Sequence, residues 1–109
     1  MSKEMQPELS NKELVIALVN QIPKGRISSF GRIGDRTGIN PRIVGFILSG
    51  MTQDEMQDVP WHRVVNKDGF ISSIKLGDKG RLQASMLEDE GIEVIDFQIQ
   101  NFQSLWWDL

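Results

Sequence analysis

The chain has 109 residues, a formal net charge of −3, a single histidine and no cysteine. These values exclude disulfides, thiolate ligands and a thiol nucleophile, and they argue against a zinc site. The length predicts one domain with a single modest core, and no apolar run reaches the roughly 18 residues of a membrane span. We therefore expect a cytoplasmic protein with no cofactor, no metal and no membrane partner.

The basic residues gather in the middle of the chain. Residues 24–45 carry five basic side chains against one acidic side chain, a net of +4. Residues 59–82 carry five basic against two acidic side chains, a net of +3. Such a distribution can give an acidic protein one anion-binding face, although charges of this kind also occur on ordinary solvated surfaces.

The first helix is predicted after a flexible leader at residues 1–9. Ser10 followed by Glu13 is a capping-box pattern. Apolar residues repeat at helical spacing behind it, and Pro23 and Gly25 mark the end. The pattern predicts a helix over about residues 11–21 with these inward positions: Leu14, Val15, Ala17, Leu18 and Ile22.

Two short helices are predicted next, close together. Ser29 can cap a helix through about residue 37, with Gly38 as its left-handed stop. Asn40–Pro41 is an N-cap followed by proline at the first helical position, and it predicts a second helix ending near Gly50. This pair is typical of a helix-turn-helix, in which the N-terminal part of the second helix, here with Arg42, faces the DNA groove.

A polar, acidic connector over residues 51–59 leads to the segment Pro60–Val65. Proline stiffens the approach, and Val64 and Val65 favour a buried, extended backbone. Trp61 and His62 would then have defined positions, as the wall of a pocket requires. A core tryptophan beside a satisfied core histidine is the commoner interpretation of this segment taken alone.

The remainder predicts a turn, a helix and a strand. Asn66–Gly69 is a turn signal before a short apolar strand at Phe70 and Ile71, and residues 72–77 form a loop. Asp78 can cap a helix over about residues 79–90 that ends at Gly91. Its expected inward positions are Leu82, Met86 and Leu87.

The C-terminal region predicts one more strand and a packed tail. Ile92, Val94 and Phe97 alternate as in a strand. The tail at residues 97–109 is expected to pack back onto the domain, because an exposed pair of Trp106 and Trp107 would favour association.

In this order the segments resemble the C-terminal domain of O6-alkylguanine-DNA alkyltransferases over roughly residues 10–95. Pro60–Val65 is similar to the alkyltransferase-like proteins, which have tryptophan in place of the reactive cysteine. Ile27–Phe30, Pro41–Gly45 and Glu88–Gly91 match further family segments. The resemblance implies a mainly α fold with a small β element, a winged helix-turn-helix-like DNA-binding domain at residues 10–96.

The resemblance also implies a partner and a binding mode. Such proteins bind double-stranded DNA containing O6-alkylguanine through the minor groove and flip the damaged nucleotide, and a monomer is expected. Arg42 would fill the vacated place in the base stack, and Phe30, where the family usually has tyrosine, would promote rotation. Ser29 and Gly45 belong to the same DNA-binding segments.

The lesion pocket implied by the resemblance comprises Trp61, Val64, Ser72, Ser73 and Lys75. Lys75 follows Ile74, near the position where family members often carry arginine. The expected structural network beneath the pocket comprises Pro60, His62, Arg63 and Glu90.

The chemistry decides between the two branches of this family. Alkyl transfer needs a thiolate, and this chain has none, so no catalytic residue is expected. The resemblance implies that the bound lesion is marked for nucleotide excision repair proteins, at a cytoplasmic, nucleoid-associated location. Two alternatives stay open: a winged helix-turn-helix transcription regulator, and a hydrolase that uses Ser72 or Ser73 with His62 and Glu90.

Overall fold

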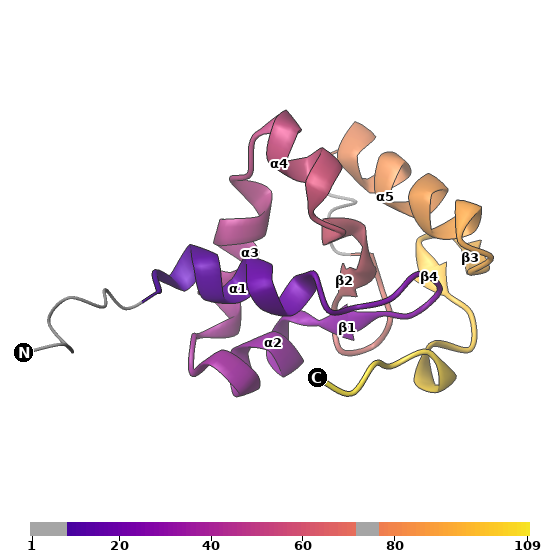
Figure 1. The fold of residues 1–109 in the computed structure, drawn as a ribbon. Helices are drawn as coiled ribbons and strands as arrows, with labels where there is room; N and C mark the ends of the chain where they lie inside the picture. The colour runs from indigo at the N-terminus through magenta and orange to yellow at the C-terminus, as the bar shows by residue number, and fades with distance from the viewer. Residues whose placement is uncertain (1–8, 72–76) are drawn as a thin grey trace, which may run out of the picture.

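The computed structural model describes residues 9–71 and 77–109, and it is mainly helical with two small sheets (Figure 1). The α-helices are α1 (Asn11–Val19), α2 (Phe30–Thr37), α3 (Pro41–Ser49), α4 (Gln53–Asp58) and α5 (Asp78–Asp89). The strands are β1 (Ser28–Ser29), β2 (Val64–Val65), β3 (Val94–Ile95) and β4 (Gln98–Ile99). Short 3-10 turns lie at η2 (Trp61–Arg63) and η4 (Phe102–Ser104). The predicted fold class is confirmed.

Within the described ranges, no helix is long and apolar enough to cross a membrane. No group of histidine and carboxylate side chains in the same ranges is arranged to hold a metal ion.

The predicted helix-turn-helix is present. The side chains of Ser10 and Glu13 form both bonds of the capping box at α1. The Ser29 hydroxyl caps α2, Gly38 ends it with φ 75°, and Asn40 caps α3. Helix α1 packs against both α2 and α3, so the three helices form one unit.

A parallel pair of strands joins this unit to the Pro60–Val65 segment. Ser28 is opposite Val64 and Ser29 is opposite Val65. In Figure 1 this pair lies between the first three helices and α5. Because Ser29 is also the cap of α2, the pairing fixes the start of the helix-turn-helix beside Trp61 and His62.

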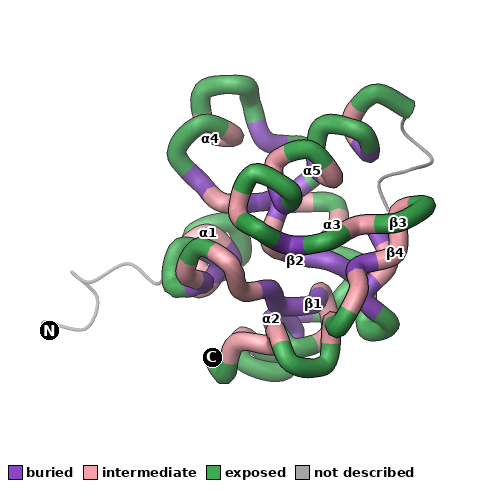
Figure 2. The backbone as a smooth tube through the Cα atoms, turned by 90° about the vertical axis from the view of Figure 1, so that its right-hand side faces the viewer, coloured by how far each residue is buried: buried purple, intermediate pink, exposed green. Residues whose placement is uncertain are grey.

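The buried side chains form two clusters rather than the single core that the length predicts. Successive residues of a strand point to opposite faces. Val64 therefore joins the cluster with α1–α3 and Trp61, whereas Val65 joins a second cluster with Ile27 and Leu87. Figure 2 shows buried backbone along β1 and β2, between the exposed outer turns of the helices.

Several sequence predictions need correction. The connector at residues 51–59 contains α4, which begins with a capping box formed by Thr52 and Glu55. Helix α5 begins at Asp78 itself, and the N-cap is Gly77 without a side-chain bond. Leu82 is 48% exposed, and Gln83 is buried in its place. Ala17 in α1 is also exposed.

The predicted strand at residues 92–97 is a tight hairpin instead. Strands β3 and β4 pair antiparallel, with Val94 opposite Ile99. The two residues between them, Asp96 and Phe97, have φ values of 50° and 65°. Positive φ at both central residues is the geometry of a type I′ turn, which usually takes glycine or asparagine. The sequence therefore offered no signal for this hairpin.

The tail contacts the domain next to β1. Ile27 forms a bridge with Trp106, and the amide of Trp107 donates to the carbonyl of Ile27 at 2.8 Å. The Arg26 guanidinium donates to the carbonyls of Leu105 and Trp106 at 3.0 and 2.6 Å. The tail thus reinforces the segment that leads into α2.

Candidate nucleic-acid interface

The Pro60–Val65 segment is a rigid, buried turn. The amide of Trp61 donates to the carbonyl of Val59 at 2.7 Å, and the amide of Arg63 donates to the carbonyl of Pro60 at 3.1 Å. Trp61 is 5% exposed and His62 is 6% exposed. The predicted fixed placement of these two side chains is therefore present.

Glu90 joins three separate parts of the chain around this turn. Its carboxylate lies 2.6 Å from Nε2 of His62 and 2.7 Å from Nη2 of Arg63. It also accepts from the amide of Gly25 at 2.9 Å. Arg63 in turn donates to the carbonyl of Ile22 at 2.8 Å. The expected contact of His62 with Glu90 is present, within a larger cluster than the sequence indicated.

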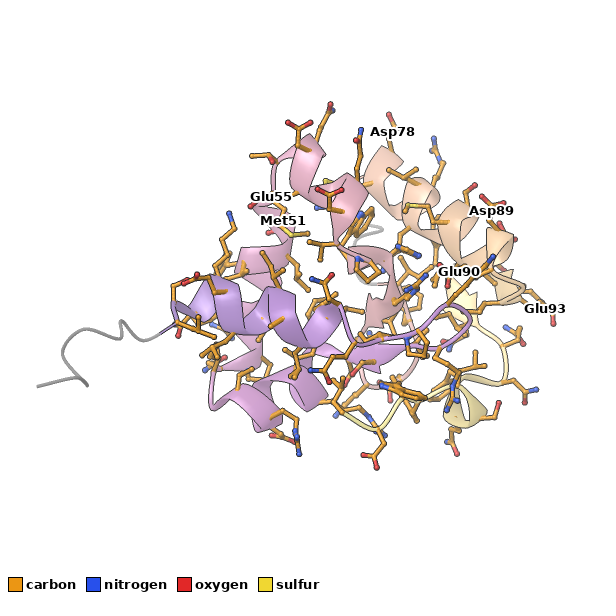
Figure 3. The ribbon with its side chains drawn as sticks, viewed as in Figure 1. Met51, Glu55, Asp78, Asp89, Glu90 and Glu93 are labelled. Carbon is orange, nitrogen blue, oxygen red and sulfur yellow. The ribbon has the colours of Figure 1, made fainter. Side chains whose placement is uncertain are left out.

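The position of Glu90 separates it from its acidic neighbours. In Figure 3, Asp89 and Glu93 lie at the outer edge of the molecule, whereas Glu90 lies between the end of α5 and the segment before β1. The side chain of Glu90 is only 8% exposed. A carboxylate at the C-terminal end of a helix opposes the helix dipole, and the cluster with Arg63 and His62 offsets that penalty.

The protonation states follow from this geometry. Burial opposes ionisation of Glu90, but hydrogen bonds from Arg63, the Gly25 amide and His62 outweigh it and lower the pKa of Glu90 to about 2, from an ordinary 4.5. Burial lowers the pKa of His62, although Glu90 acts in the opposite direction. A neutral His62 that donates from Nε2 leaves a lone pair on Nδ1, which has no hydrogen-bond partner among the described residues. A proton there would have no acceptor, which agrees with the lowered pKa.

A glutamine that the sequence analysis missed anchors the backbone of the turn. Nε2 of Gln83 donates to the carbonyls of His62 and Val64, at 3.0 Å each. Gln83 lies on the inward face of α5, where the apolar pattern placed Leu82. A glutamine in a helix usually faces solvent, so its role could only be found in the tertiary structure.

The backbone of the expected pocket residues is engaged within the protein. The amide of Val64 donates to the carbonyl of Trp61, and the carbonyl of Val64 accepts from Gln83. Each carbonyl oxygen keeps a second lone pair for another donor. Ser72, Ser73 and Lys75, expected opposite these groups, lie outside the described residues.

Lys79 is a second contact that the sequence analysis missed. Its ammonium nitrogen lies 5.2 Å from the centroid of the Trp61 ring, within the range of a cation–π interaction. Burial lowers the pKa of Lys79. The first turn of α5 thus supplies a cation to the face of the indole.

The helix-turn-helix brings Arg42 and Phe30 to one surface. Arg42 is exposed at the second position of α3, and its amide donates to Oδ1 of Asn40 at 2.8 Å. Phe30 is half-buried at the first position of α2. Both line an open groove of about 470 Å³, together with Pro41, Gly45, Phe46 and Ser49.

Ser29 has a different place in this arrangement. It is 3% exposed, and its hydroxyl accepts from the amide of Arg32 at 3.1 Å. Its side chain therefore acts as the helix cap that orients Phe30. Gly45 lies one turn after Arg42, and a Cβ atom at this position would meet nothing within 4 Å.

Comparison with known proteins agrees with this geometry. The family model for the DNA binding domain of 6-O-methylguanine DNA methyltransferase matches residues 10–92. The chain is 42% identical over 82 residues to a DNA base-flipping protein of Vibrio parahaemolyticus, covering 73% of this chain and 78% of the relative. It is 31% identical over 87 residues to Alkyltransferase-like protein 1 of Schizosaccharomyces pombe, covering 78% and 79%.

The fold is also similar to that of solved complexes. The crystal structure of S. pombe Atl1 with damaged DNA containing O6-carboxymethylguanine matches with a TM-score of 0.78 and 29% identity. This match covers 90% of our chain and 94% of the other. The matched residues 10–92 include the helix-turn-helix, the β1–β2 pair and the Pro60–Val65 turn, and the chain belongs to the family of the 6-O-methylguanine DNA methyltransferase DNA-binding domain.

Proposed function

We propose that this protein recognises O6-alkylguanine in duplex DNA, turns the damaged nucleotide out of the base stack and holds it without removing the alkyl group. The observation that carries the proposal is the indole of Trp61, fixed in the Pro60–Val65 turn of a chain without cysteine. Relatives named as base-flipping and alkyltransferase-like proteins support the assignment, as does the S. pombe complex with damaged DNA.

The absence of transfer follows from the chemistry of the side chains. A nucleophile must attack the O6-linked carbon, and an indole offers none. The lone pair on Nδ1 of His62 does not replace the missing nucleophile, because this nitrogen is buried. The His62 ring packs edge-on against Trp61, with 6.2 Å between the ring centroids. The His62–Glu90–Arg63 cluster therefore serves to hold the turn in place.

Flipping requires a side chain to replace the lost stacking. It costs a few kcal/mol, and less for a damaged base that pairs poorly. Arg42 is exposed at the N-terminal end of α3, where entry of the helix into the minor groove would bring it to the vacated site. Phe30 lines the same groove and would crowd the neighbouring phosphate.

A protein that binds a lesion and leaves it unchanged must pass it to another system. We propose that the complex marks the site for nucleotide excision repair proteins, and that the protein acts as a monomer at the nucleoid. Glu88 and Asp89 at the end of α5 are exposed acidic residues that do not belong to α3. They are available to a basic partner.

The test compares duplexes that contain O6-methylguanine, O6-carboxymethylguanine or guanine at one position, by fluorescence anisotropy at fixed salt. We expect tighter binding of the alkylated duplexes, and mass spectrometry of the recovered DNA should show the alkyl group intact. In the Arg42→Ala variant, the ratio of affinities for alkylated and plain duplexes should fall by about tenfold or more. No side chain would then fill the gap that the flipped nucleotide leaves in the base stack.

The matched control is Arg81→Ala, which removes an exposed arginine from α5. It should lower affinity for both duplexes slightly and keep the preference. Equal affinity of the wild-type protein for alkylated and plain duplexes would refute the proposal and favour a sequence-specific regulator. Loss of the alkyl group from the DNA would favour an enzyme.

A further inference from the structure

The outward face of α3 carries an aromatic side chain that the proposed flipping mechanism does not use. Phe46 is 67% exposed, the highest value among the large apolar side chains of the described residues. It follows Arg42 by four positions, so the two side chains lie on one stripe of the helix. The opposite face of α3 is buried through Val44 and Leu48. Phe46 is therefore presented outward by a helix whose opposite face is packed in the core.

The surroundings of Phe46 form a shallow, largely apolar groove. Phe30 and Pro41 line it with Phe46, and Gly45 leaves the helix backbone uncovered beside the ring. Arg42 supplies the only charge among the described residues that line the groove, and α3 contains no acidic residue. The groove thus combines apolar carbon with positive charge.

These properties match the wall of a DNA minor groove. The groove of B-form DNA is about 6 Å wide, whereas an α-helix with its side chains measures about 10–12 Å across. A helix that enters must hold the groove open, and minor-groove proteins commonly do so with apolar side chains that also bend the duplex. The walls are built from sugar faces, which present carbon and hydrogen between charged phosphates.

We infer that Phe46 packs against the deoxyribose wall of the minor groove and keeps the groove widened around α3. The inference rests on the proposed function, which places this helix in the minor groove. Four residues of helix advance by about 6 Å, so Phe46 contacts the groove wall beyond the nucleotide at which Arg42 acts. The two residues then have separate tasks: Phe46 supports the bent duplex, damaged or not, and Arg42 selects the lesion.

Duplex DNA is favoured over a second copy of the chain as the occupant of this surface. In a two-fold dimer the same patch meets itself. Such a contact would place Arg42 of both copies in one interface with no acidic residue of α3 to pair with them. Phosphates beside the sugar wall provide that negative charge.

The experiment measures affinity and bending for the Phe46→Ala variant with plain and O6-methylguanine duplexes. We expect affinity for both duplexes to fall about tenfold, as for loss of one buried phenyl ring, with the ratio between them kept within about twofold. The slope of log affinity against log salt should stay unchanged, because an apolar contact releases no counterions. End-to-end energy transfer in a labelled duplex should report a smaller bend.

Two further variants sharpen the result. Phe46→Leu should recover part of the DNA affinity. Ile95→Ala, which truncates another exposed apolar side chain, should leave DNA affinity and bending as in the wild type. Both Phe46 variants should melt as the wild type does, since truncating an exposed side chain rarely changes stability by more than about 0.5 kcal/mol.

Unchanged affinity of Phe46→Ala would overturn the inference, as would a loss confined to the alkylated duplex. A DNA-free dimer that depends on Phe46 in sedimentation velocity would also overturn it. Failure of the proposed function is distinct: the wild type would then show no lesion preference, while the plain-duplex measurements on Phe46 could still succeed or fail.

Discussion

Glu90 holds the Trp61 turn in place through contacts with three separate groups. One carboxylate satisfies the Arg63 guanidinium, the His62 ring and the Gly25 amide, and so ties α5, η2 and the segment before β1 together. Removing one partner of a buried ion pair is far more damaging than replacing both, because the other charge is left without compensation.

We predict that Glu90→Gln lowers the free energy of unfolding by about 2–4 kcal/mol, since Arg63 would keep a largely buried charge. Urea denaturation at pH 7 measures the change. Glu93→Gln, which neutralises an exposed carboxylate close by, should have little effect. Adding Arg63→Met to Glu90→Gln should restore part of the loss, and a double variant as unstable as the sum of the two single variants would contradict the assigned pairing.

The same cluster predicts how stability depends on pH. The folded pKa of Glu90 is about 2, below its ordinary 4.5, so its contribution is complete above pH 4.5 and is lost as pH falls toward 2. The pKa of His62 is also lowered from its ordinary 6.5. As pH falls below 6.5, the histidine of the unfolded chain therefore takes up a proton more readily than that of the folded protein, and this lowers stability as well. Unfolding curves at pH 7, 5 and 3 should show a smaller decline below pH 4.5 for Glu90→Gln than for the wild type.

At the scale of elements, two glycines in α2 and α3 differ in how closely other atoms approach them. A Cβ atom at Gly34 would lie 2.6 Å from the carbonyl oxygen of Ile39, in the turn between the helices. The turn therefore closes against the backbone of α2. Gly45 in the middle of α3 has open space instead, so nothing within the described protein requires glycine there.

We predict opposite effects for alanine at these two positions. Gly34→Ala should destabilise the protein by about 1–3 kcal/mol, because overpacking forces backbone movement. Gly45→Ala should stabilise it by up to about 1 kcal/mol through helix propensity. If α3 enters DNA at Gly45, the same variant should bind duplex DNA less tightly.

Thermal melting and anisotropy on the same samples measure the two effects. Gly38→Ala separates backbone strain from steric clash. Its φ of 75° strains an alanine, but a Cβ atom there would meet nothing within 4 Å, unlike at Gly34. Tighter or unchanged DNA binding by Gly45→Ala would show that α3 does not approach the DNA backbone at that residue.

The elements also show where sequence patterns sufficed. Local signals predicted the capping box at Ser10, the cap at Ser29, the proline start of α3 and the stop at Gly38, because each depends on residues within one or two turns. Helix α4 has the same kind of signal, Thr52 followed by Glu55, but its lack of buried residues left no apolar pattern to support it.

At the scale of the whole molecule, the C-terminal tail packs against the segment that leads into the helix-turn-helix. Arg32 lies 4.5 Å from the ring centroid of Trp106, and Arg26 lies 5.3 Å from that of Trp107. Together with the bridge to Ile27, these contacts connect the last residues of the chain to β1 and α2. The tail is thus part of the framework that positions Phe30.

We predict that removing residues 105–109 lowers the free energy of unfolding by about 2–4 kcal/mol, from lost hydrogen bonds and from exposure of Ile27. Denaturation in urea measures this loss, with Asp108→Ala as a control at an exposed position. DNA affinity of the folded fraction should fall as well, since α2 loses its support. A truncated chain as stable as the full one would show that the tail is only loosely attached.

The sequence by itself determined the helix-turn-helix, the buried turn at Trp61 and the lack of a thiol nucleophile, because these depend on local conformational preferences and on composition. Only the tertiary structure decided that Gln83 rather than Leu82 faces inward, that the Lys79 ammonium lies over the Trp61 ring and that the Gly25 amide donates to Glu90. Such contacts join residues far apart in the chain. A polar side chain has no periodic signature that tells burial from exposure, so its partner is defined only when the fold brings the two together.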